Sequence, residues 1–122
     1  MTSDESRLRL ADYLSHMLEG VRLAREYVAG ISKEDFFKDR RTQQAVVLNL
    51  ITIGEAASRI VTEHKGFSTG HSEIPWAQMR GMRNRMAHGY FDIDLNIVWD
   101  TVHSSLPELE RQLRVVVSQT TS

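Results

Sequence analysis

Apolar residues recur every three or four positions along most of the chain, which is the spacing expected when one face of a helix is buried. The first such stretch predicts a helix over residues 5–29, with Ser3 or Asp4 as its N-cap and Gly30 at its C-terminal end. Its apolar face contains Leu10, Leu14, Met17, Leu18, Val21, Ala24 and Val28. The chain therefore opens with a long amphipathic helix.

A second long helix is expected over residues 40–64, with Asp39 as its N-cap, after a short helical turn near Phe36. Its apolar stripe contains Val47, Leu50, Ile51, Ala57, Ile60 and Val61. Gly54 and Ala57 have small side chains, so another helix can approach this one closely at that point.

The pattern is interrupted over residues 65–74, which we interpret as a loop because small and flexible residues gather there. These residues are Gly66, Ser68, Thr69 and Gly70. Pro75 fits the first position of a third helix, which runs toward His88, where Gly89 can end or distort it.

The final helix follows a turn in which Asp92 and Asp94 provide the cap. Its apolar repeat is Leu95, Val98, Val102, Leu106, Leu109, Leu113 and Val116. Pro107 lies inside this repeat, so we expect a kink near Ser104. Because the connections are short, the pattern predicts an all-α fold, an antiparallel four- to five-helix bundle, as a single domain over residues 1–122.

The composition is that of a soluble globular protein, with 41% hydrophobic and 25% charged residues. The formal net charge of −1 provides no overall attraction to nucleic acid, so any anion-binding site has to be local. The absence of cysteine excludes a disulfide scaffold, a thiolate metal site and a cysteine nucleophile. Neither an apolar signal core nor a membrane-length apolar run is present, so we expect a cytoplasmic protein without a membrane partner.

Candidate chemistry is concentrated in residues 80–90. Three arginines and one histidine occur within nine residues, no acidic residue accompanies them, and an asparagine and a tyrosine stand beside them. The residues in question are Arg80, Arg83, Asn84, Arg85, His88 and Tyr90. One interpretation is an amphipathic helix whose solvated face happens to be basic. The alternative is a local site for a nucleotide or an RNA strand.

The order of these residues is informative. Arg83 and Asn84, three residues, His88, one residue and Tyr90 resemble the Arg-x4-6-His signature of HEPN domains and, more closely, the Arg-x4-His-x-Tyr form of the HepT family. The neighbouring sequences also resemble that family, over roughly residues 8–113. They are Ile53-Gly-Glu-Ala-Ala57, Ile74-Pro-Trp76 and Phe91-Asp-Ile-Asp94.

This resemblance implies a HEPN-like helical bundle that forms a homodimer and cuts RNA as an endoribonuclease, without a metal or another cofactor. It implies the toxin of a type II- or VII-like toxin–antitoxin pair. Its partner would be an MntA-like nucleotidyltransferase antitoxin that transfers AMP to Tyr90, which would make the chain a nucleotide-carrying phosphoprotein. An alternative for Tyr90 is that it only packs under the final helix.

The chemistry of the residues is consistent with this resemblance. Metal-free RNA cleavage needs a group that moves a proton near neutral pH, and His88 is of that type. The transition state concentrates negative charge on phosphate oxygens, which the guanidinium of Arg83 can meet with two hydrogen bonds. Asn84 could hold a phosphate, a base or the histidine ring, and Arg80 and Arg85 would attract the RNA strand.

Helix geometry adds a constraint, because at about 100° per residue Arg83 and His88 lie roughly 140° apart on a regular helix. Either the helix ends before His88, or two copies pack so that their motifs complete each other. We favour a two-fold dimer with the motifs near the axis.

Two other functions fit the sequence: a non-catalytic HEPN subunit that binds nucleotide or RNA and partners a nucleotidyltransferase, and a plain helical interaction protein. A metal site is not indicated, because the other histidines lack the spacing of zinc ligands. These are His16, His64, His71 and His103. Glu55 lies one turn from Arg59 and is expected in a solvated or interhelical ion pair.

Overall fold

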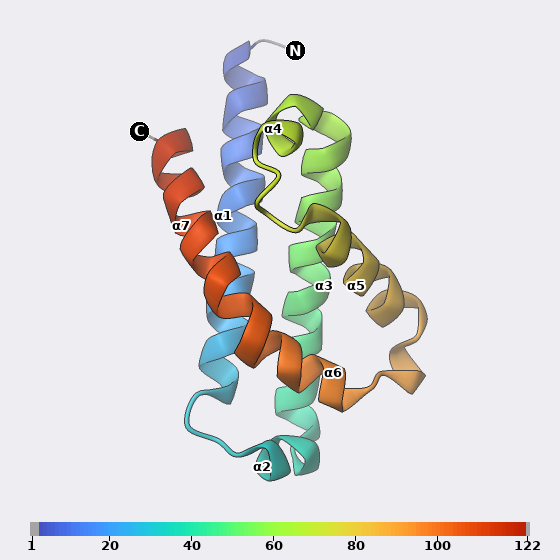
Figure 1. Cartoon of the computed structure of the whole chain (residues 1–122). Helices are drawn as coiled ribbons and strands as arrows, with labels where there is room; N and C mark the ends of the chain where they lie inside the picture. The colour runs from blue at the N-terminus through green and yellow to red at the C-terminus, as the bar shows by residue number, and fades with distance from the viewer. Residues whose placement is uncertain (1–2, 122) are drawn as a thin grey trace.

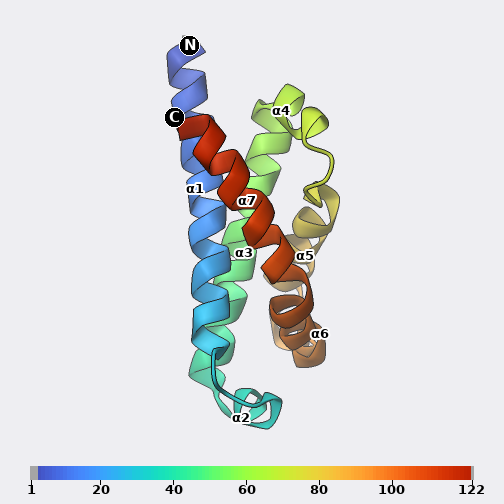
Figure 2. The same ribbon diagram turned by 60° about the vertical axis from the view of Figure 1, so that its left-hand side comes forward.

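The fold is an antiparallel helical bundle; the computed structural model describes residues 3–121 and contains no strand among them. Two long helices, α1 (Ser3–Val28) and α3 (Arg40–Glu63), run antiparallel and side by side (Figure 1). α5 (Trp76–His88) packs against α3, and α7 (Leu106–Thr121) crosses α1 (Figure 2). The predicted all-α, HEPN-like architecture is confirmed.

α1 begins slightly earlier than predicted and ends where expected. Ser3 and Asp4 already lie within the helix, so the prediction that one of them is the N-cap is wrong. At the other end Gly30 has a φ of +79°, a left-handed conformation that glycine adopts without the steric penalty of a Cβ atom. Gly30 therefore lets the chain leave α1 and turn back.

The turn before α3 is held by two side-chain caps. The hydroxyl of Ser32 accepts a hydrogen bond from the Asp35 N–H at 3.0 Å and starts α2 (Lys33–Lys38). The carboxylate of Asp39 accepts one from the Thr42 N–H at 3.1 Å and starts α3, as predicted. Hydrogen bonds from the Thr42 hydroxyl and N–H lower the pKa of Asp39.

The prediction of a loop over residues 65–74 is wrong for residues 65–70, where α4 (Lys65–Gly70) forms, and is confirmed for residues 71–74, which are turns and a bend. The ring of Phe67 stacks on His71 with 4.1 Å between ring centroids, and the indole N–H of Trp76 donates to the His71 carbonyl at 3.0 Å. These contacts join residues four and five positions apart, and α4 also packs against α3; together they outweigh the low helix propensity of the two glycines.

The final helical stretch is divided into α6 (Leu95–Asp100), a π-helical turn η2 (Thr101–Ser105) and α7. The Leu106 N–H donates to the Thr101 carbonyl, five residues back, rather than to the carbonyl four residues back. Pro107 follows, has no N–H to donate and crowds the preceding turn. The irregularity predicted near Ser104 is therefore present, as a π-helical turn.

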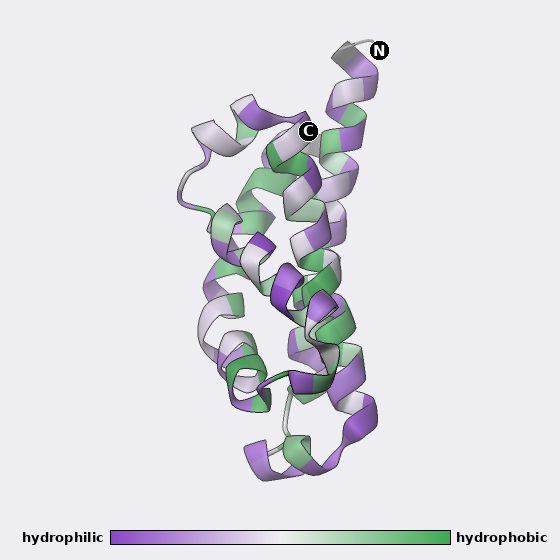
Figure 3. Cartoon of the chain, turned by 90° about the vertical axis from the view of Figure 1, so that its right-hand side faces the viewer, coloured by the Kyte–Doolittle hydropathy of each residue, from purple (hydrophilic) through white to green (hydrophobic). Residues whose placement is uncertain are grey.

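The core is a single cluster of buried apolar side chains in which α3 is the central helix. α3 is long and apolar enough, by length and composition alone, to cross a membrane. It contacts α1, α4, α5 and α6, and its buried residues belong to the core. Figure 3 shows the apolar stretches where the helices meet, so packing inside the bundle explains the apolar character of α3.

Candidate functional site

The C-terminal end of α5 forms one wall of an open groove of about 430 Å³. α5 follows Pro75 and ends at His88, where Gly89 takes the C-cap position and its N–H donates to the Arg85 carbonyl at 2.9 Å. Gly89 thus ends the helix, as predicted. The groove is lined by Asn84, Arg85, Met86, His88, Gly89, Asp92, Ile93, Asp94 and Ile97, and we call it the His88 groove.

The opposite wall of the His88 groove comes from the residues that follow α5. The 3-10 turn η1 (Tyr90–Asp92) leads to Asp94, whose carboxylate accepts a hydrogen bond from the Asn96 N–H at 2.9 Å and caps α6. Asp92 and Asp94 therefore contribute two acidic residues to the lining of this groove. The sequence analysis assigned these residues to a turn and a cap and missed their place in the groove.

Several polar side chains on α5 are not engaged elsewhere in the protein. Within residues 3–121, no hydrogen bond or ion pair involves the side chains of Arg80, Asn84, Arg85 or His88. Asn84, Arg85 and His88 are also exposed. They are consequently available to an incoming molecule.

Arg83 lies on a different side of α5, where it faces α3. Its guanidinium donates to the Ser58 hydroxyl at 3.0 Å and lies 3.5 Å from a carboxylate oxygen of Glu55. The Arg83 side chain is 26% exposed, and its Nε is buried without a partner among the described residues. This residue is therefore anchored to α3 while part of its surface stays accessible.

The close contact of α3 and α5 depends on Gly54. A Cβ atom at this position would lie 2.3 Å from the Arg83 Cβ and 2.6 Å from the Met79 carbonyl oxygen. No side chain fits at those distances, so the two helices can meet there only over a glycine. The prediction of a close helix approach at this position is confirmed.

α5 continues as a helix through His88, so the alternative in which the helix ends before His88 is wrong. Within the chain Arg83 faces α3, whereas His88 lines the groove. The helix therefore does not bring these two side chains together.

Glu55 connects two arginines. It lies 3.7 Å from Arg59 on its own helix, as expected, and 3.5 Å from Arg83 on α5. The sequence analysis missed the second contact and missed Ser58 as a partner of Arg83. The signal that could have revealed both is their position beside Gly54, where close approach of another helix was expected.

The backbone of Tyr90 begins η1, two residues beyond His88. The position of its side chain lies outside what the structure describes. Whether Tyr90 packs under the final helix or faces the groove therefore stays a prediction.

Two of the remaining histidines serve as packing side chains. The ring of His71 stacks on Phe67, and that of His103 stacks on Trp99 with 3.9 Å between centroids. In the described part of the chain, no three histidine, aspartate or glutamate side chains gather in a way that could hold a metal ion.

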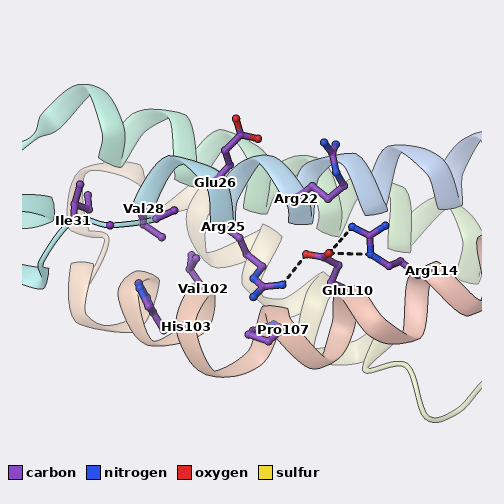
Figure 4. A pocket seen from close by; sticks show the side chains of 12 residues that line it. Arg22, Arg25, Glu26, Val28, Ile31, Val102, His103, Pro107, Glu110 and Arg114 are labelled. Atoms are coloured by element: carbon purple, nitrogen blue, oxygen red, sulfur yellow. Dashed lines mark hydrogen bonds and ion pairs between the residues drawn. The ribbon is translucent and has the colours of Figure 1, made fainter.

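A second polar groove, of about 530 Å³, lies between α1 and α7 (Figure 4). We call it the α1–α7 groove; its polar lining includes Arg22, Arg25, Glu26, His103, Glu110 and Arg114. Arg25 and Arg114 both donate to Glu110, at 2.8 and 2.7 Å. Burial raises the pKa of Glu110, but the hydrogen bonds from Arg114 and Arg25 outweigh it and lower this pKa overall. These charges satisfy one another and link two helices.

Comparison with known proteins identifies the family to which the chain belongs. The model of the family described as ribonuclease HepT-like matches residues 17–116, which contain both walls of the His88 groove. A protein of Caldanaerobacter subterraneus subsp. tengcongensis that is designated an RNase is 38% identical over 107 residues, covering 88% of this chain and 93% of its own length. One of Thermococcus cleftensis, designated ribonuclease HepT, is 39% identical and covers 81% of this chain and 87% of its own. No solved structure matches significantly. The chain therefore belongs to the ribonuclease HepT-like family of HEPN proteins.

Proposed function

We propose that the protein is a metal-independent endoribonuclease that acts at the His88 groove. The observation that carries this proposal is the set of exposed, unengaged side chains Asn84, Arg85 and His88 around one groove. Such groups can contact a phosphate and move a proton without first breaking internal contacts. Similarity to the RNase designations of the relatives supports the same reaction class.

In this reaction the 2′-hydroxyl of a ribose attacks the adjacent phosphorus. His88 takes the proton from that hydroxyl, the bond from phosphorus to the 5′-oxygen breaks, and the leaving oxygen takes a proton from water. The products are a 2′,3′-cyclic phosphate and a free 5′-hydroxyl. Arg83 is proposed to stabilise the charge on the phosphate, with Asn84, Arg80 and Arg85 holding the strand.

We further propose that a homodimer is the active form. Within one protomer Arg83 and His88 lie on different sides of α5, and Arg85 shares the groove lining with Asp92 and Asp94. A two-fold axis near α5 would bring arginines of a second copy toward this groove. One symmetric contact would then bring an arginine of the second copy to His88 and add positive charge to the His88 groove.

The proposed physiological setting is a cytoplasmic toxin–antitoxin pair. An MntA-like nucleotidyltransferase would inactivate the ribonuclease by transferring AMP to Tyr90. Tyr90 directly follows Gly89, which lines the His88 groove, so an AMP on a tyrosine side chain that faces this groove would add a phosphate and a base beside the proposed RNA site. Charge recognition and access would be blocked together.

The decisive experiment is cleavage of single-stranded RNA by purified, unmodified protein in EDTA. Activity is expected, with 2′,3′-cyclic or 3′-phosphate ends, and a requirement for a divalent metal would contradict the proposed mechanism. Light scattering should give twice the 14.0 kDa monomer mass. After incubation with the transferase and ATP, intact mass should rise by AMP units in the wild type but not in Tyr90→Phe.

A second function is favoured by one specific contact. The guanidinium of Arg83 faces the carboxylate of Glu55, which offsets part of the charge that a phosphate would need. A non-catalytic HEPN subunit that binds nucleotide or RNA and partners the transferase would tolerate this pairing. RNA binding without any cleavage by the wild type would select that function.

A further inference from the structure

A third groove lies beside the His88 groove, on the other side of the residues that follow α5. It has a volume of about 460 Å³. We call it the Phe91 groove; it is lined by Arg40, Gln43, Gln44, Val47, Phe91, Ile93 and Leu95. Ile93 lines both grooves, so the two grooves adjoin at this residue.

The Phe91 residue is 98% exposed, whereas the next most exposed aromatic residue among those described, Tyr27, is 41% exposed. Phe36, for example, is fully buried against Trp99, with 5.4 Å between ring centroids. A solvent-exposed apolar ring forgoes the stabilisation that burial provides. Exposed aromatic rings are also the surfaces on which proteins stack the bases of single-stranded nucleic acids.

The polar groups of the Phe91 groove are suited to a phosphate. Arg40 forms no ion pair within residues 3–121, and no carboxylate lines the groove. The neighbouring Asp39 directs its oxygens to the N–H and hydroxyl of Thr42. Gln44 is exposed one turn along α3 from Arg40 and offers an amide to a base or a sugar.

We propose that the Phe91 groove binds the nucleotide next to the one held in the His88 groove. Its base would stack on Phe91, and its phosphate would bind Arg40. The proposal rests on the proposed ribonuclease function and extends it, because it defines the substrate as a single strand that spans both grooves. An unpaired cation, an exposed ring and the absence of a carboxylate favour RNA over a protein as the occupant.

The test measures RNA binding in the His88→Ala background, which prevents cleavage during the titration. A dinucleotide and a longer single-stranded RNA are compared by fluorescence anisotropy over a series of salt concentrations. Phe91→Ala should raise the Kd for the longer strand about 5- to 100-fold, whereas Phe91→Trp should keep it near that of the parent protein. Arg40→Ala should reduce the slope of log affinity against log salt by about 0.7.

Arg7→Ala is the matched control, because Arg7 is exposed and pairs only with Asp4 near the start of α1. It should leave both the Kd and the salt slope unchanged. Thermal unfolding should show that Phe91→Ala and Arg40→Ala are folded, as expected for exposed residues. Unchanged RNA affinity in both variants would overturn the subsite, and loss of binding to the transferase in those variants would assign the groove to that protein instead.

The experiment distinguishes failure of the Phe91 groove proposal from failure of the ribonuclease proposal. If the wild type cleaves RNA but neither variant changes binding, only the Phe91 subsite is refuted. If the wild type does not cleave RNA in EDTA, the ribonuclease proposal fails, whatever the Phe91 groove binds.

Discussion

Three arginines line the α1–α7 groove and one lines the His88 groove, and the two grooves differ in whether these arginines have carboxylate partners. In the α1–α7 groove, Arg25 and Arg114 donate to a single carboxylate, that of Glu110, which is only 15% exposed. In the His88 groove, Arg85 projects from α5 without a hydrogen bond or ion pair to the described residues. The charges of the α1–α7 groove join two helices, whereas Arg85 in the His88 groove is available to a ligand.

This difference shows why groove size and arginine content alone are poor guides to a site. The α1–α7 groove is the larger of the two, and it contains more arginines. A phosphate entering it would have to displace Glu110 from two hydrogen-bonded cations, at a cost that the His88 groove does not impose. The two grooves differ in whether their arginines are paired with a carboxylate, not in whether arginines are present.

The strongest test of the comparison replaces one histidine from each groove. His88→Ala should lower the rate of RNA cleavage about 10²- to 10⁴-fold, because it removes the proposed proton-transfer group. His103→Ala is the matched control, since the ring of His103 stacks on Trp99 and its Nδ1 hydrogen-bonds the Trp99 carbonyl at 2.9 Å, away from the His88 groove; its loss should leave the rate unchanged. Single-turnover cleavage assays measure both, and an equal loss in the two variants would abolish the distinction between the grooves.

A second test disturbs the support of α5 without touching the α1–α7 groove. Gly54→Ala should destabilise the fold by about 1–3 kcal/mol and reduce cleavage, because the added methyl collides with backbone and side-chain atoms of α5. Gly81→Ala is the control: nothing lies within 4 Å of its added Cβ, so about 0.5–1 kcal/mol of stabilisation is expected. Urea unfolding measures both changes, and tolerance of Gly54→Ala would show that the close approach of α3 and α5 is dispensable.

A third test compares the effects of replacing one arginine in each groove on RNA binding and on stability. Arg85→Ala should reduce the salt slope of RNA binding by about 0.7 and leave thermal stability unchanged. Arg25→Ala should do the reverse, lowering stability by roughly 0.5–1 kcal/mol through loss of its partly exposed ion pair, with RNA affinity retained. Anisotropy and thermal denaturation on the same samples provide both values. A common phenotype for the two variants would contradict the separation of roles.

The smallest expected effect is a pH dependence of stability. The pKa of Glu110 is lowered in the folded protein, so its contribution is present above the ordinary carboxyl pKa and is lost as pH falls through the lowered value. Glu110→Gln should therefore be less stable than the wild type at neutral pH and should lose less stability on acidification below about pH 4.5. Denaturation curves across that range test this, and parallel curves for both proteins would show that Glu110 is not linked to folding.

The helices and most of their ends were predictable because they depend on local sequence. Apolar spacing, the cap at Asp39 and the left-handed Gly30 act within a few residues of themselves, so their effects can be deduced without the rest of the fold. α4 was not predictable in this way. Two glycines weaken its local helix signal, and its packing against α3 depends on the tertiary fold.

In the candidate site, too, the features that depend on local sequence were predictable and those that depend on tertiary packing were not. The angular separation of Arg83 and His88 follows from the helix repeat and was expected. The anchoring of Arg83 by Ser58 and Glu55 requires knowing that α5 is the helix that packs over Gly54. Small residues indicate where another helix can come close, but they do not identify that helix.

The π-helical turn η2 has a consequence for how the chain tolerates changes in length. A π-turn is equivalent to one residue inserted into an α-helix, and that residue rotates α6 relative to α7 by about 100°. Deleting one residue from η2 would produce a more regular helix and yet turn α6, with its cap Asp94, away from the His88 groove. A deletion that makes the helix more regular would thus remove one wall of the His88 groove. Homologous chains that differ in length at η2 should therefore differ in the shape of this groove.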